Sequence, residues 1–185
     1  MPDLPNFHFL MRDLTQEIDA GRITAIDAAM RTSEYIQKTL NCAHVSFWRF
    51  AGEGEQRVIR RFAGFDGVNG VPLTEPFEVP EGGSGYFDTL AQAGCYICSD
   101  TFADPQLSGA MDSVLLPFNI HALLSASYGS NGEVWGVITC TDSVVRKWLP
   151  GEITALRKCA AEISVRRARR REREAAAGKV GFFEV

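Results

Sequence analysis

Residues 121–142, HALLSASYGSNGEVWGVITCTD, are the strongest hairpin signal in the 185-residue chain. Two apolar runs flank four turn-forming residues, Gly129 to Gly132. Apolar runs joined by a short turn of glycine, serine and asparagine are typical of two antiparallel strands. We expect these to be the last two strands of a sheet.

The two faces of this hairpin differ in chemistry. Successive side chains of a strand point to opposite faces, so residues two apart share a face. One face therefore collects hydroxyl groups among apolar side chains: His121, Leu123, Ser125, Ser127, Val137, Thr139 and Thr141. Hydroxyls on an otherwise apolar sheet face suit a small neutral or weakly polar ligand.

The N-terminal part of the chain predicts two helices. Apolar residues recur at helical spacing from Phe7 to Ile18, and Gly21 follows as a C-cap. Thr24 then stands three residues before Asp27, as in a capping box, and a second helical stripe continues to residue 41. A long second helix is expected.

Two strands and a loop are expected next. The runs HVSFWRFA (residues 44–51) and RVIRRFAGF (57–65) are rich in β-branched and aromatic residues and flank the turn GEGEQ. They predict an antiparallel hairpin. Residues 71–85, VPLTEPFEVPEGGSG, are rich in proline and glycine and are interpreted as loop. A short helix over residues 86–93, closed by Gly94, follows.

Three elements remain around the quoted hairpin. CYICSD, residues 95–100, is a short buried-strand candidate. Asp104 and Pro105 supply the N-cap and first position of a helix that is expected to run to about Leu116, before Pro117. After Pro150, apolar residues at spacings of three and four predict a final helix to about residue 177.

The predicted organisation is one α+β domain with helical ends. At this length a single core is self-sufficient. N-terminal helices occupy residues 1–40, the core 41–150, the C-terminal helix 151–177 and a tail 178–185. No internal repeat is seen.

Composition places the chain in the ordinary soluble globular class. Apolar residues make up 45% of the chain and charged residues 23%, with a net charge of −4. The N-terminus lacks the pattern of a secretion signal, and no window reaches the ~18 uncharged apolar residues that a membrane span needs. The five cysteines are an odd number scattered through apolar runs, which favours reduced thiols and a cytoplasmic location.

Cationic charge is concentrated at the two ends of the chain. From Phe62 to Val145 there is no lysine or arginine, which argues against a phosphate-bearing ligand in that segment. Six arginines lie in the eight residues Arg166 to Arg173. We favour a solvated helix or coiled-coil connector with Glu162–Arg166 pairing, because aromatic residues and recognition motifs that would indicate nucleic-acid or anionic-membrane contact are missing there.

The order of motifs resembles a GAF domain, a ligand-binding relative of the PAS fold, over about residues 40–165. The match rests on SFWRF, GCYICSD, ADPQ, FNIHALLSASY, GEVWGVITCTD and KWLPGE, with GxxWG and WxxxE spacings. The resemblance implies a central antiparallel sheet of about six strands with helices on both faces. It also implies a small-molecule pocket between the sheet and the helix of residues 104–116, and long terminal helices that form a dimeric bundle.

Ligand-contacting candidates follow from the predicted strand faces and from this implied pocket. They are Trp48, Phe87, Asp100, Met111, Leu115, His121, Leu123, Ser125, Thr139 and Thr141. For several of them plain core packing is the competing interpretation. No catalytic residue, metal ligand or cofactor is predicted.

Other chemistries of the family fit the residues less well. Bilin-binding GAF domains carry a chromophore-attaching Cys-His pair, but the corresponding positions here are Ala110 and Met111, and a thioether needs a thiol. The residue pattern of cyclic-nucleotide-binding members has no counterpart. The stretch Gly82 to Gly85 could cradle an anion, but a lone glycine-rich stretch is weak support and we interpret it as a loop.

Cys95 and Cys98 form a CxxC spacing, which is found in redox-active cysteine pairs. Some stand-alone GAF proteins reduce free methionine sulfoxide with cysteines. Redox CxxC pairs start at a helix N-terminus, whereas CYIC is predicted as a strand, in which residues three apart point to opposite faces. Buried thiols are therefore favoured. A zinc site from Cys95, Cys98, His121 and Cys140 meets the same objection, because four ligands must converge.

The function predicted from the sequence is a cytoplasmic small-molecule-sensing or regulatory module that acts as a homodimer through a downstream signalling protein. One alternative is an enzyme resembling free methionine-(R)-sulfoxide reductase. The other is a dimerisation module that has lost its ligand.

Overall fold

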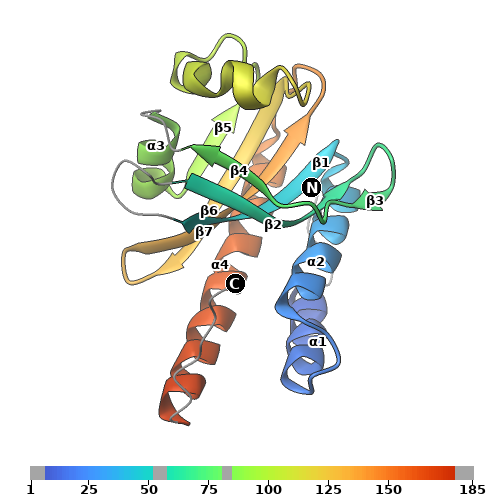
Figure 1. Ribbon diagram of the computed structural model, residues 1–185, viewed down its shortest axis with the longest axis vertical. Coiled ribbons are helices and arrows are strands. Elements are labelled where there is room, and N and C mark those ends of the chain that lie inside the picture. The colour runs from blue at the N-terminus through green and yellow to red at the C-terminus, as the bar shows by residue number, and fades with distance from the viewer. Residues whose placement is uncertain (1–6, 52–57, 81–84, 178–185) are drawn as a thin grey trace.

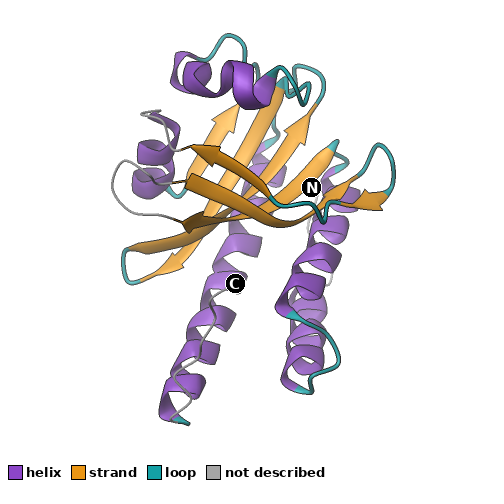
Figure 2. Cartoon of the chain, in the orientation of Figure 1, coloured by secondary structure: helices purple, strands orange, loops and turns teal. Residues whose placement is uncertain are grey.

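The computed structural model describes residues 7–51, 58–80 and 85–177. Within them, seven strands form one antiparallel sheet in the order β3-β2-β1-β7-β6-β5, with β4 paired to β2 (Figures 1 and 2). The strands are β1 His44–Ala51, β2 Val58–Asp66, β3 Val71–Pro72, β4 Phe77–Pro80, β5 Cys95–Cys98, β6 Ala122–Ser130 and β7 Glu133–Asp142. The predicted α+β fold with an antiparallel sheet is confirmed.

The hairpin of β6 and β7 is tighter than the sequence suggested. Pairing extends to Ser130 and Glu133, so the turn consists of Asn131 and Gly132. Both residues have positive φ, 55° and 80°. This geometry matches the right-handed twist of the flanking strands. The long hairpin supplies two central strands of the sheet.

Three long helices cover one face of the sheet. They are α1 Phe7–Asp19, α2 Ala25–Leu40 and α4 Pro150–Ala176. The predicted capping box is present, because Asp27 N donates to Thr24 Oγ1 at 3.1 Å and Thr24 N donates to Asp27 Oδ2 at 2.8 Å. In Figure 1, α4 and the α1–α2 pair extend beyond the sheet in the same direction.

The side chains between these helices and the sheet form what we call the α4-side core. Burial of this apolar surface is the main favourable contribution to the fold. Its fully or nearly fully buried members are Phe7, Ile36, Leu40, Cys42, Val45, Phe47, Ala63, Cys95, Ala122, Leu124, Ala126, Tyr128, Ile138, Cys140, Trp148, Ala155, Leu156, Cys159 and Ala160.

Three shorter helices cover the opposite face. They are α3 Gly85–Ala93, the 3₁₀ helix η2 Pro105–Ala110 and the π-helical turn η3 Met111–Leu115. The sequence predicted one helix from Asp104 to about Leu116, so that prediction is corrected. Asp104 does cap the segment, accepting from Gln106 N at 3.0 Å. Gly109, a poor helix former, lies at the end of η2, where the helical geometry changes.

Two strands, β3 and β4, lie within residues 71–85, for which the sequence predicts a loop. β3 pairs with the end of β2, and β4 pairs with its beginning. In β4, Phe77 and Val79 face the sheet interior, whereas Glu78 points outward and forms an ion pair with Arg60 at 2.6 Å. The prolines that suggested a loop are compatible with strands at a sheet edge.

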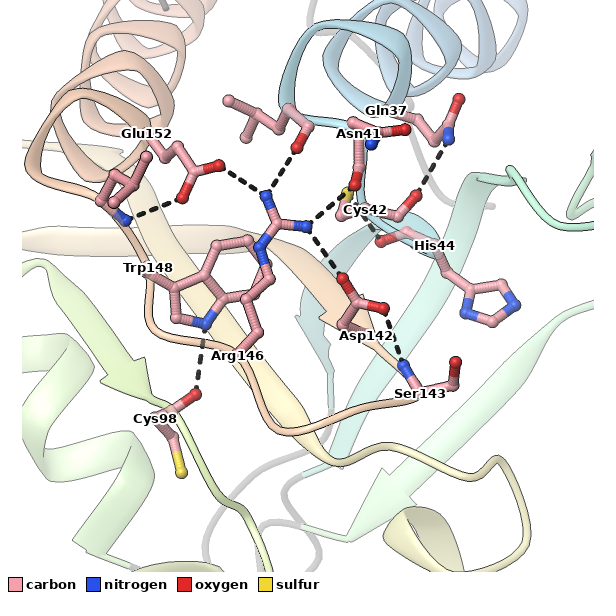
Figure 3. A network of polar contacts seen from close by, with 12 residues as sticks. Gln37, Asn41, Cys42, His44, Cys98, Asp142, Ser143, Arg146, Trp148 and Glu152 are labelled. Atoms are coloured by element: carbon pink, nitrogen blue, oxygen red, sulfur yellow. Dashed lines mark hydrogen bonds and ion pairs between the residues drawn. The ribbon is translucent and has the colours of Figure 1, made fainter.

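Arg146 joins three elements on the side of the α4-side core (Figure 3). Its Nη1 donates to the main-chain oxygen of Asn41 at 2.9 Å and to Asp142 Oδ2 at 2.8 Å. Its Nη2 donates to the main-chain oxygen of Leu40 at 2.7 Å and to Glu152 Oε1. The end of α2, the end of β7 and the start of α4 are thereby held together.

The WxxxE spacing reinforces the same junction. The Trp148 indole Nε1 donates to the main-chain oxygen of Cys98 at 3.2 Å, and the Arg146 guanidinium lies 4.4 Å from the centre of a Trp148 ring. Glu152 accepts from Leu149 N at 2.8 Å at the start of α4. The motif therefore anchors α4 to the edge strand β5.

Among the described residues, no helix combines the length and the apolar character that crossing a membrane requires.

Candidate functional site

The candidate site is the layer of side chains between the sheet and α3, η2 and η3, which we call the α3-side layer. It is mainly aromatic and aliphatic. Its buried members are Trp48, Ile59, Val79, Tyr86, Phe87, Leu90, Tyr96, Cys98, Leu107, Leu115, Leu123 and Val137. Partly buried Phe50, Phe77, Ala110, Met111, Val114 and Ile120 pack against them.

The hydroxyls of the central strands bond to aromatic residues of this layer. The Trp48 indole Nε1 donates to Thr139 Oγ1 at 2.8 Å, and the Tyr86 hydroxyl donates to Ser125 Oγ at 3.0 Å. All four residues are buried. The pairs join β1 to β7 and α3 to β6, so the polar groups fix how α3 lies on the sheet.

A third polar pair lies toward η2. The Tyr96 hydroxyl donates to Asp104 Oδ2 at 2.7 Å. Burial and the neighbouring Asp104 carboxylate raise the pKa of the Tyr96 hydroxyl, and the same two causes raise the pKa of the Cys98 thiol to about 12. Both groups are therefore neutral at physiological pH.

Eight of the ten predicted contact residues lie on or in the α3-side layer. Five belong to it or pack on it: Trp48, Phe87, Met111, Leu115 and Leu123. Ser125 and Thr139 reach it through the hydrogen bonds above, and buried Thr141 follows Thr139 on the same face of β7. Ligand contact by these residues stays a prediction.

For Asp100 and His121, the structure shows contacts with loop residues next to the layer, and ligand contact by these two residues also stays a prediction. Asp100 Oδ1 accepts from Phe102 N at 3.1 Å and so closes a turn after β5. The His121 ring lies 4.3 Å from the ring of Phe102, centre to centre, and its Nε2 is 3.1 Å from Asn119 Oδ1. Both side chains contact residues of the loops between the end of β5 and the start of β6.

Sequence reasoning did not name several residues of the layer or its edge, among them Arg61, Phe77, Tyr86 and Tyr96. Alternation along CYIC could have revealed Tyr96, which shares its face with Cys98. Arg61 corrects the expectation that the ligand side lacks a cation, because its guanidinium lies 5.7 Å from the ring centre of Phe77. A register irregularity between Phe47 and Trp48 decides which side Arg61 takes, and the sequence pattern did not reveal it.

The CxxC cysteines lie on opposite sides of the sheet. Cys95 belongs to the α4-side core, whereas Cys98 belongs to the α3-side layer. Burial raises the pKa of the Cys95 thiol as well as that of Cys98. A reactive thiol needs a lowered pKa and access to solvent, and neither cysteine has this environment.

The four residues weighed as zinc ligands are likewise separated. Cys95 and Cys140 lie in the α4-side core, Cys98 lies across the sheet, and His121 contacts Phe102. Across residues 7–51, 58–80 and 85–177, no three histidine, cysteine or acidic side chains gather in a metal-binding arrangement.

Strand β6 contacts helices on both faces of the sheet. Ser127 Oγ donates to the main-chain oxygen of Leu90 in α3 at 3.3 Å. Two residues further, Gly129 N donates to Ser164 Oγ of α4 at 3.0 Å. One strand thus links the helix that covers the candidate site to the longest helix of the fold.

Some arginines in the C-terminal half of α4 contact other side chains of the fold. The predicted Glu162–Arg166 pair is present at 2.6 Å. Arg167 and Arg171 lie over the Trp135 ring, with the guanidinium carbons 5.4 and 5.1 Å from its centre. This part of α4 therefore contacts the β6–β7 hairpin as well as solvent.

Comparison with known proteins identifies similar sequences and folds. A family model described as GAF domain matches residues 24–166. No curated protein matches the chain significantly.

Several solved structures are similar in fold. The phycocyanobilin-bound GAF domain of a cyanobacterial phytochrome has a TM-score of 0.72 and 16% identity, with 90% of this chain and 96% of that chain covered. A phycoerythrobilin-bound GAF domain of a cyanobacterial phytochrome has a TM-score of 0.70 and 15% sequence identity, with 90% of this chain and 97% of that chain covered. Bacteriophytochrome RpBphP3 from R. palustris has a TM-score of 0.66 and 14% sequence identity, with 95% of this chain and 40% of that chain covered.

Proposed function

The chain belongs to the GAF domain family, and we propose that it is a sensory or regulatory module that binds a small molecule in the α3-side layer. The observation that carries the proposal is the double attachment of β6. Through Ser125 and Ser127 this strand is bonded to α3, and through Gly129 it is bonded to α4. A ligand that shifts α3 on the sheet would thereby also bias the position of α4.

The composition of the layer supports a mostly apolar ligand with few polar groups. Aromatic rings such as Trp48 and Phe87 provide the apolar surface. Buried hydroxyls, among them those of Thr139 and Thr141, provide points that fix orientation. Binding sites for small molecules have this mixture of apolar lining and a few placed polar groups.

The ligand is proposed to bind non-covalently. The similar GAF domains named above hold bilins, but Ala110 and Met111 stand where a bilin-attaching Cys-His pair is expected. A tetrapyrrole is one member of the candidate ligand class. Smaller aromatic metabolites fit the same chemistry.

The terminal helices are proposed to form the output as a homodimer in the cytoplasm that acts on a downstream signalling protein. α4 and the α1–α2 pair extend beyond the sheet on the same side (Figure 1). Exposed Val165 and the arginines of α4 give this region surface for a second copy or a partner. Five reduced cysteines in the described residues support a reducing compartment.

The first experiment is a thermal-shift screen of the full chain. Amino acids, methionine sulfoxide, nucleotides, tetrapyrroles and aromatic metabolites form the panel. A ligand present at 100 times its dissociation constant adds about 2.7 kcal/mol to the free energy of unfolding. The Thr141→Val variant should weaken a hit, and the exposed Thr154→Val variant of α4 should not. A panel without any stabilising compound would contradict the sensor proposal.

The second candidate function is a dimerisation module without a ligand. It is favoured by one observation: the buried indole and hydroxyl of Trp48 and Tyr86 already bond to Thr139 and Ser125. Light scattering of the purified chain measures its oligomeric state. A dimer that no compound stabilises would favour this second function, and methionine sulfoxide consumption that is lost in Cys95→Ser or Cys98→Ser would instead indicate the reductase alternative.

A further inference from the structure

We infer that Arg61 forms an anion-binding subsite at the edge of the α3-side layer, so that the ligand carries a carboxylate or a similar anionic group on an apolar body. This inference rests on the proposed function and specifies the chemical class of its ligand.

Strand register brings Arg61 to the candidate site. In β2 it pairs with Trp48 of β1 on one side and with Phe77 of β4 on the other. Trp48 and Phe77 contact each other edge to face, with ring centres 6.1 Å apart. Phe77 in turn contacts Phe118 beyond η3, with ring centres 4.9 Å apart. Arg61 thus lies next to an aromatic wall that joins the sheet to the end of η3.

The guanidinium of Arg61 is incompletely bonded. Its Nη2 donates to the main-chain oxygen of Glu75 at 3.0 Å, but its Nε is buried and has no hydrogen-bond partner in the described residues. Burial lowers the pKa of Arg61, although the nearby Glu75 carboxylate opposes this effect. Within the described part of the chain, no carboxylate lies within ion-pair distance of Arg61.

A partly buried cation whose Nε has no hydrogen-bond partner gains more from an anion than any other polar group of the layer. The Trp48, Tyr86 and Tyr96 donors already have acceptors, so a ligand must break those bonds to use them. Among residues 7–51, 58–80 and 85–177, Arg61 has no ion-pair partner that an anion would displace. The planar guanidinium also matches a carboxylate in a two-bond geometry. The aromatic residues beside it would hold the apolar body of the same ligand.

The neighbouring Arg60 supplies a matched control. It is exposed on the opposite face of β2, and its Nε donates to Glu78 Oε1 at 2.6 Å. Replacing either arginine by glutamine removes one positive charge from the same strand. The two variants therefore have the same net charge and differ in whether the α3-side layer loses its cation.

The test is isothermal titration calorimetry of the full chain with indole-3-acetate, indole-3-acetamide and inorganic phosphate. The proteins are wild type, Arg61→Gln, Arg61→Lys and Arg60→Gln, each checked by circular dichroism. We expect wild type and Arg60→Gln to bind the carboxylate at least 10-fold more tightly than the amide. Arg61→Gln should bind the two compounds equally, and Arg61→Lys should retain part of the preference. Phosphate binding that Arg61→Gln abolishes would support the subsite and assign it to a free anion.

Equal binding of carboxylate and amide by wild type would overturn the inference while leaving a ligand-binding site in place. A preference that survives in Arg61→Gln would overturn it in the same way. Absence of binding by all three compounds, together with a thermal-shift panel that gives no hit, would overturn the inference and the proposed function together.

Discussion

The Trp48 indole and the Thr139 hydroxyl, 91 residues apart in sequence, form a buried hydrogen bond of 2.8 Å across β1 and β7. Trp48→Phe should leave the Thr139 hydroxyl buried without this donor and lower the free energy of unfolding by about 1–3 kcal/mol. Thr139→Val should cost a similar amount. Urea denaturation of both variants measures these changes.

The double variant separates this bond from general packing. The hydrogen bond is already lost in either single variant, so the second substitution no longer removes it. The double variant should therefore lower the free energy of unfolding by about 1 kcal/mol less than the sum of the two single changes. Strict additivity would show that the two side chains contribute independently.

Arg146 is expected to be a major source of stability. Arg146→Met retains an aliphatic stem but leaves the Glu152 carboxylate, which is 7% exposed, without its cation. Removing one partner of a buried pair costs about 3–5 kcal/mol. Chemical denaturation followed by circular dichroism measures this loss, with exposed Lys147→Met as control. A loss below about 1 kcal/mol would place the pair among ordinary surface ion pairs.

The lowered pKa of the Asp66 carboxyl leads us to expect that the stability of the fold depends on pH in the acid range. Burial raises its pKa, but hydrogen bonds from Asn69 and Val68 and the nearby His44 outweigh this effect, so the net pKa is lowered. The folded state therefore binds this proton less readily than the unfolded state. The stability that results is present above the unfolded pKa of about 4 and is lost as the pH falls through the folded value.

Urea midpoints measured across the acid range test this dependence. The asparagine of Asp66→Asn cannot ionise, so the variant should be less stable than wild type near neutral pH. The difference in the free energy of unfolding between the two proteins should become smaller as the pH falls. A difference in the free energy of unfolding that stays constant with pH would mean that Asp66 contributes to stability through packing alone.

The cysteines are expected to be inert in the native protein. All five are buried, and burial raises the pKa of the Cys98 thiol to about 12. Because the thiolate is the reactive form, a thiol reagent such as dithionitrobenzoate should modify the native chain slowly and the denatured chain completely. Fast modification of Cys95 or Cys98 in the native state would revive the reductase alternative.

Local signals in the sequence determined most of the secondary structure and the two-faced sheet. The capping box of Thr24 and Asp27 and the alternation along β6 and β7 act over a few residues, so they can be read directly. The same alternation correctly grouped Ser125, Thr139 and Thr141 on one face and separated Cys95 from Cys98. The order of the sequence motifs, with the GxxWG and WxxxE spacings among them, indicated the family.

Tertiary structure alone decided how the site is closed and charged. The strand β4 looked like a loop because its pairing with β2 is non-local and tolerates proline at an edge. The register irregularity after Phe47 pairs Arg61 with Trp48 and so brings a cation to the α3-side layer. In the sequence, Arg61 lies directly before the segment without lysine or arginine, which begins at Phe62. The contact between the rings of His121 and Phe102 is likewise encoded by no spacing in the sequence. Sequence periodicity determines which face a side chain takes within its own strand, whereas register and loop packing determine what it meets there.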